Sequence, residues 1–140
     1  MSVQVEFFRQ NVLLIGLAIG SGLALLLPML SRSAAGISVL SVTEAVMLMS
    51  RKSALVLDVR EPDEFAQGHL QGARNVPLSQ LSARLKELEK FRDKPVLVVC
   101  ERGRRANAAA KLLKAQSFTA LNVLKGGMQA WIEAKMPSSK

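Results

Sequence analysis

The sequence has little of several residue types that would point to common classes of protein. It contains one cysteine and one histidine in 140 residues, and it has no tyrosine. A single cysteine excludes an intramolecular disulfide, so nothing in the composition indicates an oxidising compartment. One cysteine and one histidine also cannot form the clusters that hold zinc. We therefore expect neither a metal site nor a resident cofactor.

Aromatic residues amount to only 4%, although the net charge is +8. A basic balance of 19 Lys and Arg against 11 Asp and Glu often indicates nucleic-acid binding. The chain has no nucleic-acid-binding motif and few aromatic side chains on which bases can stack. We expect no nucleic-acid partner, and we attribute the charge to a membrane surface nearby or to a solvated basic face.

Charge is absent from the 22 residues between Arg9 and Arg32. Residues 12–30 are apolar apart from three glycines, one serine and one proline, and they leave no polar face for a soluble helix. A helix of this length spans about 28 Å, which is close to the thickness of the bilayer hydrocarbon. We therefore predict a transmembrane helix over residues 12–30, within an anchor and linker of residues 1–36.

A cleaved signal peptide is the alternative for this segment, because residues 33–35 are small enough for a cleavage site. The length of the apolar run and the presence of Glu6 favour an uncleaved anchor. Arg32, Arg51 and Lys52 follow the run, whereas Arg9 and the terminal amine precede it. By the positive-inside rule we predict a single-pass protein of the inner (cytoplasmic) membrane, with its C-terminal domain in the cytoplasm.

Residues 37–140 alternate between strand and helix patterns, which is typical of an α/β domain with a parallel sheet flanked by helices. The predicted strands are residues 37–40, 54–57, 96–99 and 120–124, with a short extended piece at 74–77. The predicted helices begin near Ser41, Glu61, Ser79, Ala106 and Met128. The first begins with a capping box, since Glu44 lies three residues after Ser41.

The only cysteine, Cys100, directly follows the most apolar strand. The next five residues contain Gly103 and three arginines, Arg102, Arg104 and Arg105, and an alanine-rich helix follows. The carboxyl edge of a parallel sheet is where ligands bind, and a helix N-terminus attracts anions. Both the helix and the arginines favour the nucleophilic thiolate. A buried, unreactive thiol is the alternative, but it would not need so many arginines.

Three groups of residues resemble the signatures of rhodanese-like domains, and together they cover nearly all of residues 37–140. The first group is Asp58-Val59-Arg60, Glu64-Phe65, Gly68-His69-Leu70, Gly72-Ala73, Asn75 and Pro77, the second is residues 100–105, and the third is Leu124-Lys125-Gly126-Gly127-Met128 with Trp131. The resemblance implies a rhodanese-like parallel sheet, preceded here by the one transmembrane helix.

The resemblance also implies a thiosulfate sulfurtransferase. Cys100 would take sulfane sulfur from thiosulfate or a persulfide donor, form a persulfide and pass the sulfur to cyanide or a thiol. The backbone N–H groups from Glu101 to Arg105, including that of Gly103, would surround this sulfur. Arg102, Arg104 and Arg105 would hold the anionic donor, as guanidinium groups can do with two hydrogen bonds.

The remaining signature residues are expected to support the fold. We expect Asp58 and Arg60 to pair with each other or with loop amides near the site. In the family pattern His69 belongs to a structural loop, and we place Trp131 in the core. Glu101 is included in the binding loop through its backbone, with its side chain toward solvent.

Two other functions fit parts of the pattern. Phosphatases with a related loop place an essential arginine six residues after the cysteine, and Ala106 occupies that position here. The other alternative is a membrane-tethered interaction or sulfur-relay module without turnover. The physiological donor and acceptor, any protein partner and the oligomeric state stay open.

Overall fold

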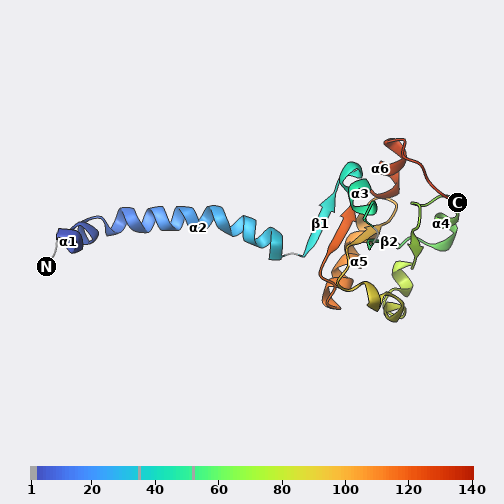
Figure 1. The fold of residues 1–140 in the computed structure, drawn as a ribbon, viewed down its shortest axis with the longest axis horizontal. Helices are drawn as coiled ribbons and strands as arrows, with labels where there is room; N and C mark the ends of the chain where they lie inside the picture. The colour runs from blue at the N-terminus through green and yellow to red at the C-terminus, as the bar shows by residue number, and fades with distance from the viewer. Residues whose placement is uncertain (1–2, 35, 52) are drawn as a thin grey trace. The chain divides into compact units, whose positions relative to one another are not determined.

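The computed structural model describes residues 3–34, 36–51 and 53–140, with the side chains of residues 28–34 left out of the description. The chain divides into two compact units, Met1–Ala35 and Gly36–Lys140. Figure 1 shows the fold of each unit.

The first unit consists of two helices, α1 (Val3–Gln10) and α2 (Val12–Ala34). Asn11 separates them, and its side-chain Nδ2 donates to the Phe7 carbonyl oxygen at 2.8 Å. Among the residues whose side chains are described, no single helix meets the length and hydropathy expected of a membrane span. Val3–Gln10 and Val12–Leu27 meet it only as a pair, with a bend of 66° between them.

The second unit is built on a five-stranded sheet in which every neighbouring pair of strands is parallel. The strands are β1 (Ile37–Leu40), β2 (Leu55–Asp58), β3 (Arg74–Asn75), β4 (Val96–Val99) and β5 (Leu121–Leu124). Their order is β1-β5-β4-β2-β3, so β4 is central and β1 and β3 form the edges (Figure 1). The predicted parallel α/β sheet is confirmed.

Three α-helices connect strands in the described part of this unit, namely α3 (Val42–Met49), α4 (Pro62–Gln67) and α5 (Arg104–Ala115), and α6 (Gly127–Glu133) follows the last strand. The predicted capping box of α3 is present, because Glu44 N–H donates to Ser41 Oγ at 3.3 Å and Ser41 N–H donates to Glu44 Oε2 at 2.9 Å. Proline is accepted in the first turn of α4, where its missing N–H would have no intrahelical partner.

The predicted helix beginning at Ser79 is wrong in its type. The segment forms two 3₁₀ helices, η1 (Leu78–Gln80) and η2 (Leu85–Phe91). Arg84 interrupts them with φ −109° and ψ 14°, and its N–H is shared between the carbonyls of Gln80 and Leu81. The apolar spacing still identified the buried side, since Leu81 and Leu88 are fully buried. Spacing of three and four residues suits either helix, so it could not distinguish the tighter one.

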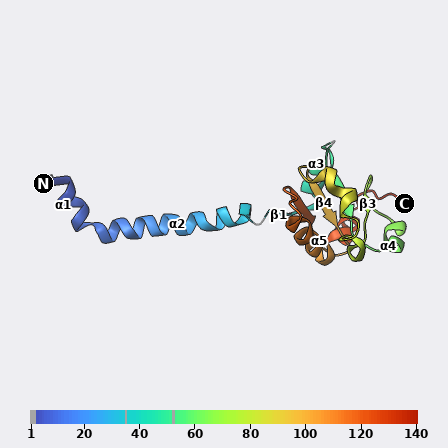
Figure 2. The same cartoon turned by 90° about the horizontal axis from the view of Figure 1, so that it is seen from below.

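Helices lie on both faces of the sheet (Figures 1 and 2). Because successive side chains of a strand point to opposite faces, the strands contribute to two separate clusters of buried residues. One layer packs Leu57 and Val98 with α5 and the 3₁₀ segment, through Ala109 and Leu113 among others. The opposite layer packs α3 and α6 with the other strand face; its members include Ala45, Leu48, Val56, Leu97, Val99, Met128 and Trp131. Burial on both sides explains why β4 reads as a continuous apolar run.

This topology places the carboxyl ends of β2, β4 and β5 at one edge of the sheet. The chain leaves β4 directly into Cys100, and β2 ends at Asp58. It leaves β5 toward Gly126 and Gly127, which have φ of +74° and +59°. The amide of Met128 then donates to the Cys100 carbonyl at 2.8 Å, so the start of α6 is fixed beneath the loop after β4.

We predict that Gly127→Ala destabilises the fold by about 2–5 kcal/mol. A Cβ at this position would meet the carbonyl oxygen of Cys100 and lie 2.6 Å from that of Glu101, in a backbone conformation that already strains alanine. Gly72→Ala is the matched control. It shares a positive φ of +75° but has no atom within 4 Å of the added carbon, so it should cost about 1 kcal/mol. Urea unfolding of both variants measures the difference, and equal losses would contradict the packing argument.

Candidate active site

The Cys100 side chain lies at the centre of the carboxyl edge and is 1% exposed. The N–H of Gly103 donates to its sulfur at 2.9 Å. Gly103 is the N-cap of α5 and has φ +106°, a left-handed conformation that favours glycine. This turn directs the Gly103 amide to the sulfur.

The loop from Cys100 to Arg105 directs its carbonyl and amide groups to different partners. The carbonyls of Cys100 and Glu101 accept from the amides of Met128 and Gln129 at 2.8 and 3.1 Å. By contrast, the four amides of residues 101, 102, 104 and 105 donate to no other residue in the described parts of the chain. Unpaired amides at a helix start are available to an anion, so the loop can hold a negatively charged group at the Cys100 sulfur.

The three loop arginines have different surroundings. Arg102 and Arg104 are exposed, and their side chains form no hydrogen bond or ion pair with any described residue. Arg105 is bonded to Glu64 instead, with its two terminal nitrogens 2.6 and 2.9 Å from the two carboxylate oxygens. The sequence alone did not distinguish the three arginines. In the structure, Arg105 is paired, and Arg102 and Arg104 have no partner among the described residues.

The Glu64–Arg105 pair connects α4 to the first turn of α5. Hydrogen bonding from Arg105 lowers the pKa of Glu64 to about 2, against an ordinary value of 4.5. The hydrogen bond to Glu64 and the nearby charges of Glu64, Cys100 and Glu101 in turn raise the pKa of Arg105 above its usual range. The amide of Glu61 also donates to Glu64 at 3.2 Å, which fixes the orientation of the carboxylate. Both partners therefore carry full charges across the working pH range.

Asp58 and Arg60 form a second pair, and this one is buried. Their side chains are 1% and 4% exposed, and Arg60 Nη2 lies 2.8 Å from Asp58 Oδ2. The same nitrogen donates to the Gly68 carbonyl at 2.7 Å, and Nη1 lies 3.4 Å from Glu101 Oε2. Asn75 donates to the backbone carbonyls of both Asp58 and Arg60.

These contacts explain how a buried guanidinium is accommodated beside the loop. Burial opposes its charge, but the hydrogen bond and charge of Asp58, with smaller contributions from Glu101, raise the pKa of Arg60 above its usual range. The Glu101 side chain is 42% exposed and directs its carboxylate to Arg60. Arg60 thus connects Asp58 and the Gly68 carbonyl to Glu101 of the Cys100 loop.

His69 and Trp131 make structural contacts. The His69 ring stacks on Phe65 with centroids 3.8 Å apart, and its Nδ1 lies 2.9 Å from the Phe65 carbonyl. The His69 backbone pairs with Ser139. Trp131 is 3% exposed and donates through Nε1 to the Pro137 carbonyl at 3.0 Å.

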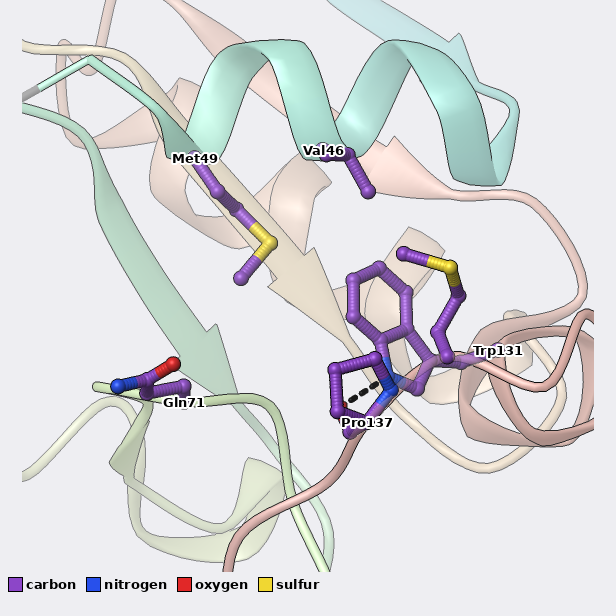
Figure 3. Close-up of a pocket in the computed structure, with 6 residues that line it drawn as sticks. Val46, Met49, Gln71, Trp131 and Pro137 are labelled. Carbon is purple, nitrogen blue, oxygen red and sulfur yellow. Dashed lines mark hydrogen bonds between the residues drawn. The ribbon is translucent and has the colours of Figure 1, made fainter.

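Trp131 also lines a pocket of about 150 Å³ whose other walls come from α3, residue 71 and the C-terminal segment (Figure 3). Its lining residues are Val46, Met49, Gln71, Trp131, Met136 and Pro137. None of them belongs to the Cys100 loop, so this pocket is separate from the candidate active site.

Within the described ranges, no three His, Cys, Asp or Glu side chains are grouped so that they can hold a metal ion. The groups that meet at the carboxyl edge are a thiol, loop amides and arginines. Such a set binds anions and offers a sulfur nucleophile.

Comparison with known proteins identifies the family. The family model for the rhodanese-like domain matches residues 41–134, which include the Cys100 loop and both flanking signatures. The chain belongs to the rhodanese-like domain family. The resemblance inferred from the three groups of signature residues is thereby confirmed.

Two curated relatives and one solved structure illustrate this membership. The uncharacterized protein YqhL of Bacillus subtilis is 42% identical over 91 residues, covering 65% of this chain and 71% of that protein. The thiosulfate sulfurtransferase GlpE of Shewanella oneidensis is 35% identical over 95 residues, covering 68% of this chain and 92% of GlpE. The crystal structure of a rhodanese-related protein from Thermoplasma volcanium has 34% identity and a TM-score of 0.65, covering 73% of this chain and 97% of that one.

The family membership supports sulfurtransferase chemistry at the level of the family. Rhodanese-like domains generally use thiosulfate or persulfide donors and thiophilic acceptors. The thiol and anion-binding loop described above provide the groups that such a reaction needs.

The sequence did not reveal the roles of Glu64 and Gly127. Glu64 entered only as part of a signature, because its partner Arg105 is 41 residues away in sequence. Gly127 likewise entered only as part of the third signature group, whereas the structure places it directly against the loop. The available signal was the consecutive pair Gly126-Gly127 between a strand and a helix, which often marks a close backbone approach.

We predict that the Glu64–Arg105 pair contributes stability that is lost in acid. Because the folded pKa of Glu64 lies below its ordinary value of 4.5, the contribution is complete above about pH 4.5 and disappears as the pH falls toward 2. Glu64→Gln removes the titrating group, so the stability difference between wild type and variant should shrink over that interval. Asp63→Asn, an exposed carboxylate on the same helix, is the control. Urea unfolding from about pH 6 to pH 2.5 measures this, and a constant difference would contradict it.

Proposed function

We propose that this protein is a sulfurtransferase that carries sulfane sulfur on Cys100 between an anionic donor and a thiophilic acceptor. The observation that supports this most directly is the position of the Cys100 sulfur, 2.9 Å from the Gly103 amide and beside loop amides that have no other partner. A terminal persulfide sulfur extends the side chain by one atom and carries a negative charge. Those amides are the donors available to stabilise it.

In the first step, the Cys100 thiolate attacks the outer sulfur of thiosulfate. A new S–S bond forms to Cys100 as the S–S bond of thiosulfate breaks. Sulfite leaves with the bonding electron pair, so no external oxidant or reductant is needed. With a persulfide donor the same attack releases a thiolate instead of sulfite. Charge stabilisation for the donor and leaving group comes from the loop amides and from Arg102 and Arg104, which are unpaired among the described residues.

In the second step, a cyanide ion or a thiolate attacks the terminal sulfur of the persulfide. The S–S bond to Cys100 breaks, and the cysteine leaves as a thiolate with the bonding pair. The products are thiocyanate or a new persulfide. The enzyme returns to its starting state, with Cys100 ready for another donor.

A phosphatase reaction has less support. The position where such loops carry their essential arginine holds Ala106, which is fully buried. Arg105, one residue earlier, is paired with Glu64.

We predict that incubation with thiosulfate adds one sulfur atom to the full-length chain, purified in mild detergent, and that Cys100→Ser prevents it. Serine keeps the size of the side chain, but its alkoxide is far less accessible than a thiolate, so sulfur transfer should fall to background. Intact-mass analysis before and after addition of cyanide measures both steps. Wild-type protein that gains no sulfur from thiosulfate or from a persulfide would rule out this function.

We further propose that residues 12–30 anchor the protein in the inner membrane, with residues 37–140 on the cytoplasmic side. The proposal is supported by the 22 uncharged residues between Arg9 and Arg32 and by the helical conformation of residues 12–30 in α2. Large apolar side chains of α2, such as Leu13, Leu17 and Leu25, are 64–76% exposed. Contact with lipid would remove that apolar surface from water.

We predict that Leu17→Arg combined with Leu23→Arg releases the protein from membranes, because each arginine at mid-bilayer costs about 2.5–3.5 kcal/mol. Alkaline extraction of membranes, followed by detection of the chain, measures the release. Met47→Arg combined with Ile132→Arg, two exposed apolar positions in the second unit, is the control with equal added charge. Wild-type protein in the soluble fraction, a mature N-terminus near residue 36, or a C-terminal reporter active only outside the cytoplasm would contradict the anchor or its orientation.

A further inference from the structure

Among the described residues, Glu64 is the only carboxylate that is paired with an arginine of the Cys100 loop. It lies on α4, outside the loop, yet both of its oxygens are bonded to Arg105. Its orientation does not depend on Arg105 alone, since the Glu61 amide also donates to it. The carboxylate is therefore held in place to receive the guanidinium.

The charges at the carboxyl edge nearly cancel as a result. Arg60 contacts two carboxylates, those of Asp58 and Glu101, and Arg105 is paired with Glu64, so these five groups together carry one excess negative charge. Arg102 and Arg104 add two positive charges and the Cys100 thiolate adds one negative charge, so the site as a whole is close to neutral. A donor with two negative charges, such as thiosulfate, then leaves the site with about two excess negative charges, whereas a singly charged persulfide leaves about one.

We propose that Glu64 sets the donor preference of the enzyme by neutralising Arg105, so that a singly charged persulfide is favoured over dianionic thiosulfate. This inference rests on the proposed sulfurtransferase function and makes it more specific. Glu64 is a positioning residue, because it acts on the donor only through Arg105. Arg105 lies in the first turn of α5, five residues after Cys100 and two residues after the Gly103 amide that contacts the sulfur, so a guanidinium released from Glu64 would stand next to the donor-binding loop.

The test compares steady-state sulfur transfer from two probes, thiosulfate and the persulfide of 2-mercaptoethanol, in the full-length protein. Glu64→Gln frees Arg105 without changing side-chain size. We expect the KM for thiosulfate to fall about three- to tenfold, and the KM for the persulfide to fall by less, because the released charge attracts a dianion more strongly. The kcat values should change little, since the reacting sulfur atoms are untouched.

Two matched variants separate this effect from general ones. Asp63→Asn makes the same change of net charge on the same helix, at an exposed residue outside the site, and should leave both KM values unchanged. Glu64→Gln combined with Arg105→Gln should lose the gain for thiosulfate, because the freed cation is then absent. If Glu64→Gln folds poorly, Glu64→Asp keeps the charge but lengthens the ion pair, and it should shift the donor preference in the same direction by a smaller amount.

The outcomes distinguish the two proposals. Sulfur transfer with the same donor preference in Glu64→Gln and Asp63→Asn would overturn the role of Glu64 and leave the sulfurtransferase function standing. A gain that persists in the double variant would also overturn it, because the effect would not pass through Arg105. If the wild-type protein accepts sulfur from neither probe, both the proposed function and this inference fail.

Discussion

The hydrogen bonds from the start of α6 to the carbonyls of Cys100 and Glu101 are the constraint on which the site depends. A short loop has as many carbonyls as amides, and an anion site needs the amides alone to face the ligand. The amides of Met128 and Gln129 bind those two carbonyls, while the amides of residues 101, 102, 104 and 105 donate to no residue that the structure describes. Gly127 has to be a glycine because the two backbones approach so closely there. Gly127, which belongs to the third group of signature residues, thus determines how the loop of residues 100–105, the second group, is arranged.

The charged side chains near Cys100 also fall into two kinds, those that are paired within the protein and those that are available to a donor. The chain carries a net charge of +8, but much of the charge near Cys100 is paired locally. Arg60 is buried and serves the fold, since removing its partner would leave an uncompensated guanidinium in the core. Arg105 is only partly buried and is held by a carboxylate that lies outside the loop. Fewer positive charges are therefore available to a donor than the number of arginines suggests.

The sequence predicted the parallel sheet and the place of Cys100 between a buried strand and a helix, because each of these depends on neighbouring residues. Buried strands are continuous apolar runs, and a glycine with arginines before an alanine-rich helix is a local pattern. It could not predict which arginine was paired, since Glu64 and Arg105 are 41 residues apart and meet only through the packing of α4 and α5. The prediction of an α-helix from Ser79 was wrong for a different reason. The apolar spacing of this segment fits an α-helix and a 3₁₀ helix equally well.

The pairs Asp58–Arg60 and Glu64–Arg105 also differ in how easily they can be substituted without loss of the fold. Asp58 and Arg60 are tied to Gly68, Asn75 and Glu101, so changing either disturbs several backbone segments at once. Glu64 and Arg105 are each about one-third exposed, and water can solvate either partner if the other is replaced. Substitutions at this second pair can therefore change the charge presented to a donor at little structural cost. The charge near the Cys100 loop can therefore be changed more easily at Glu64 and Arg105 than at Asp58 and Arg60.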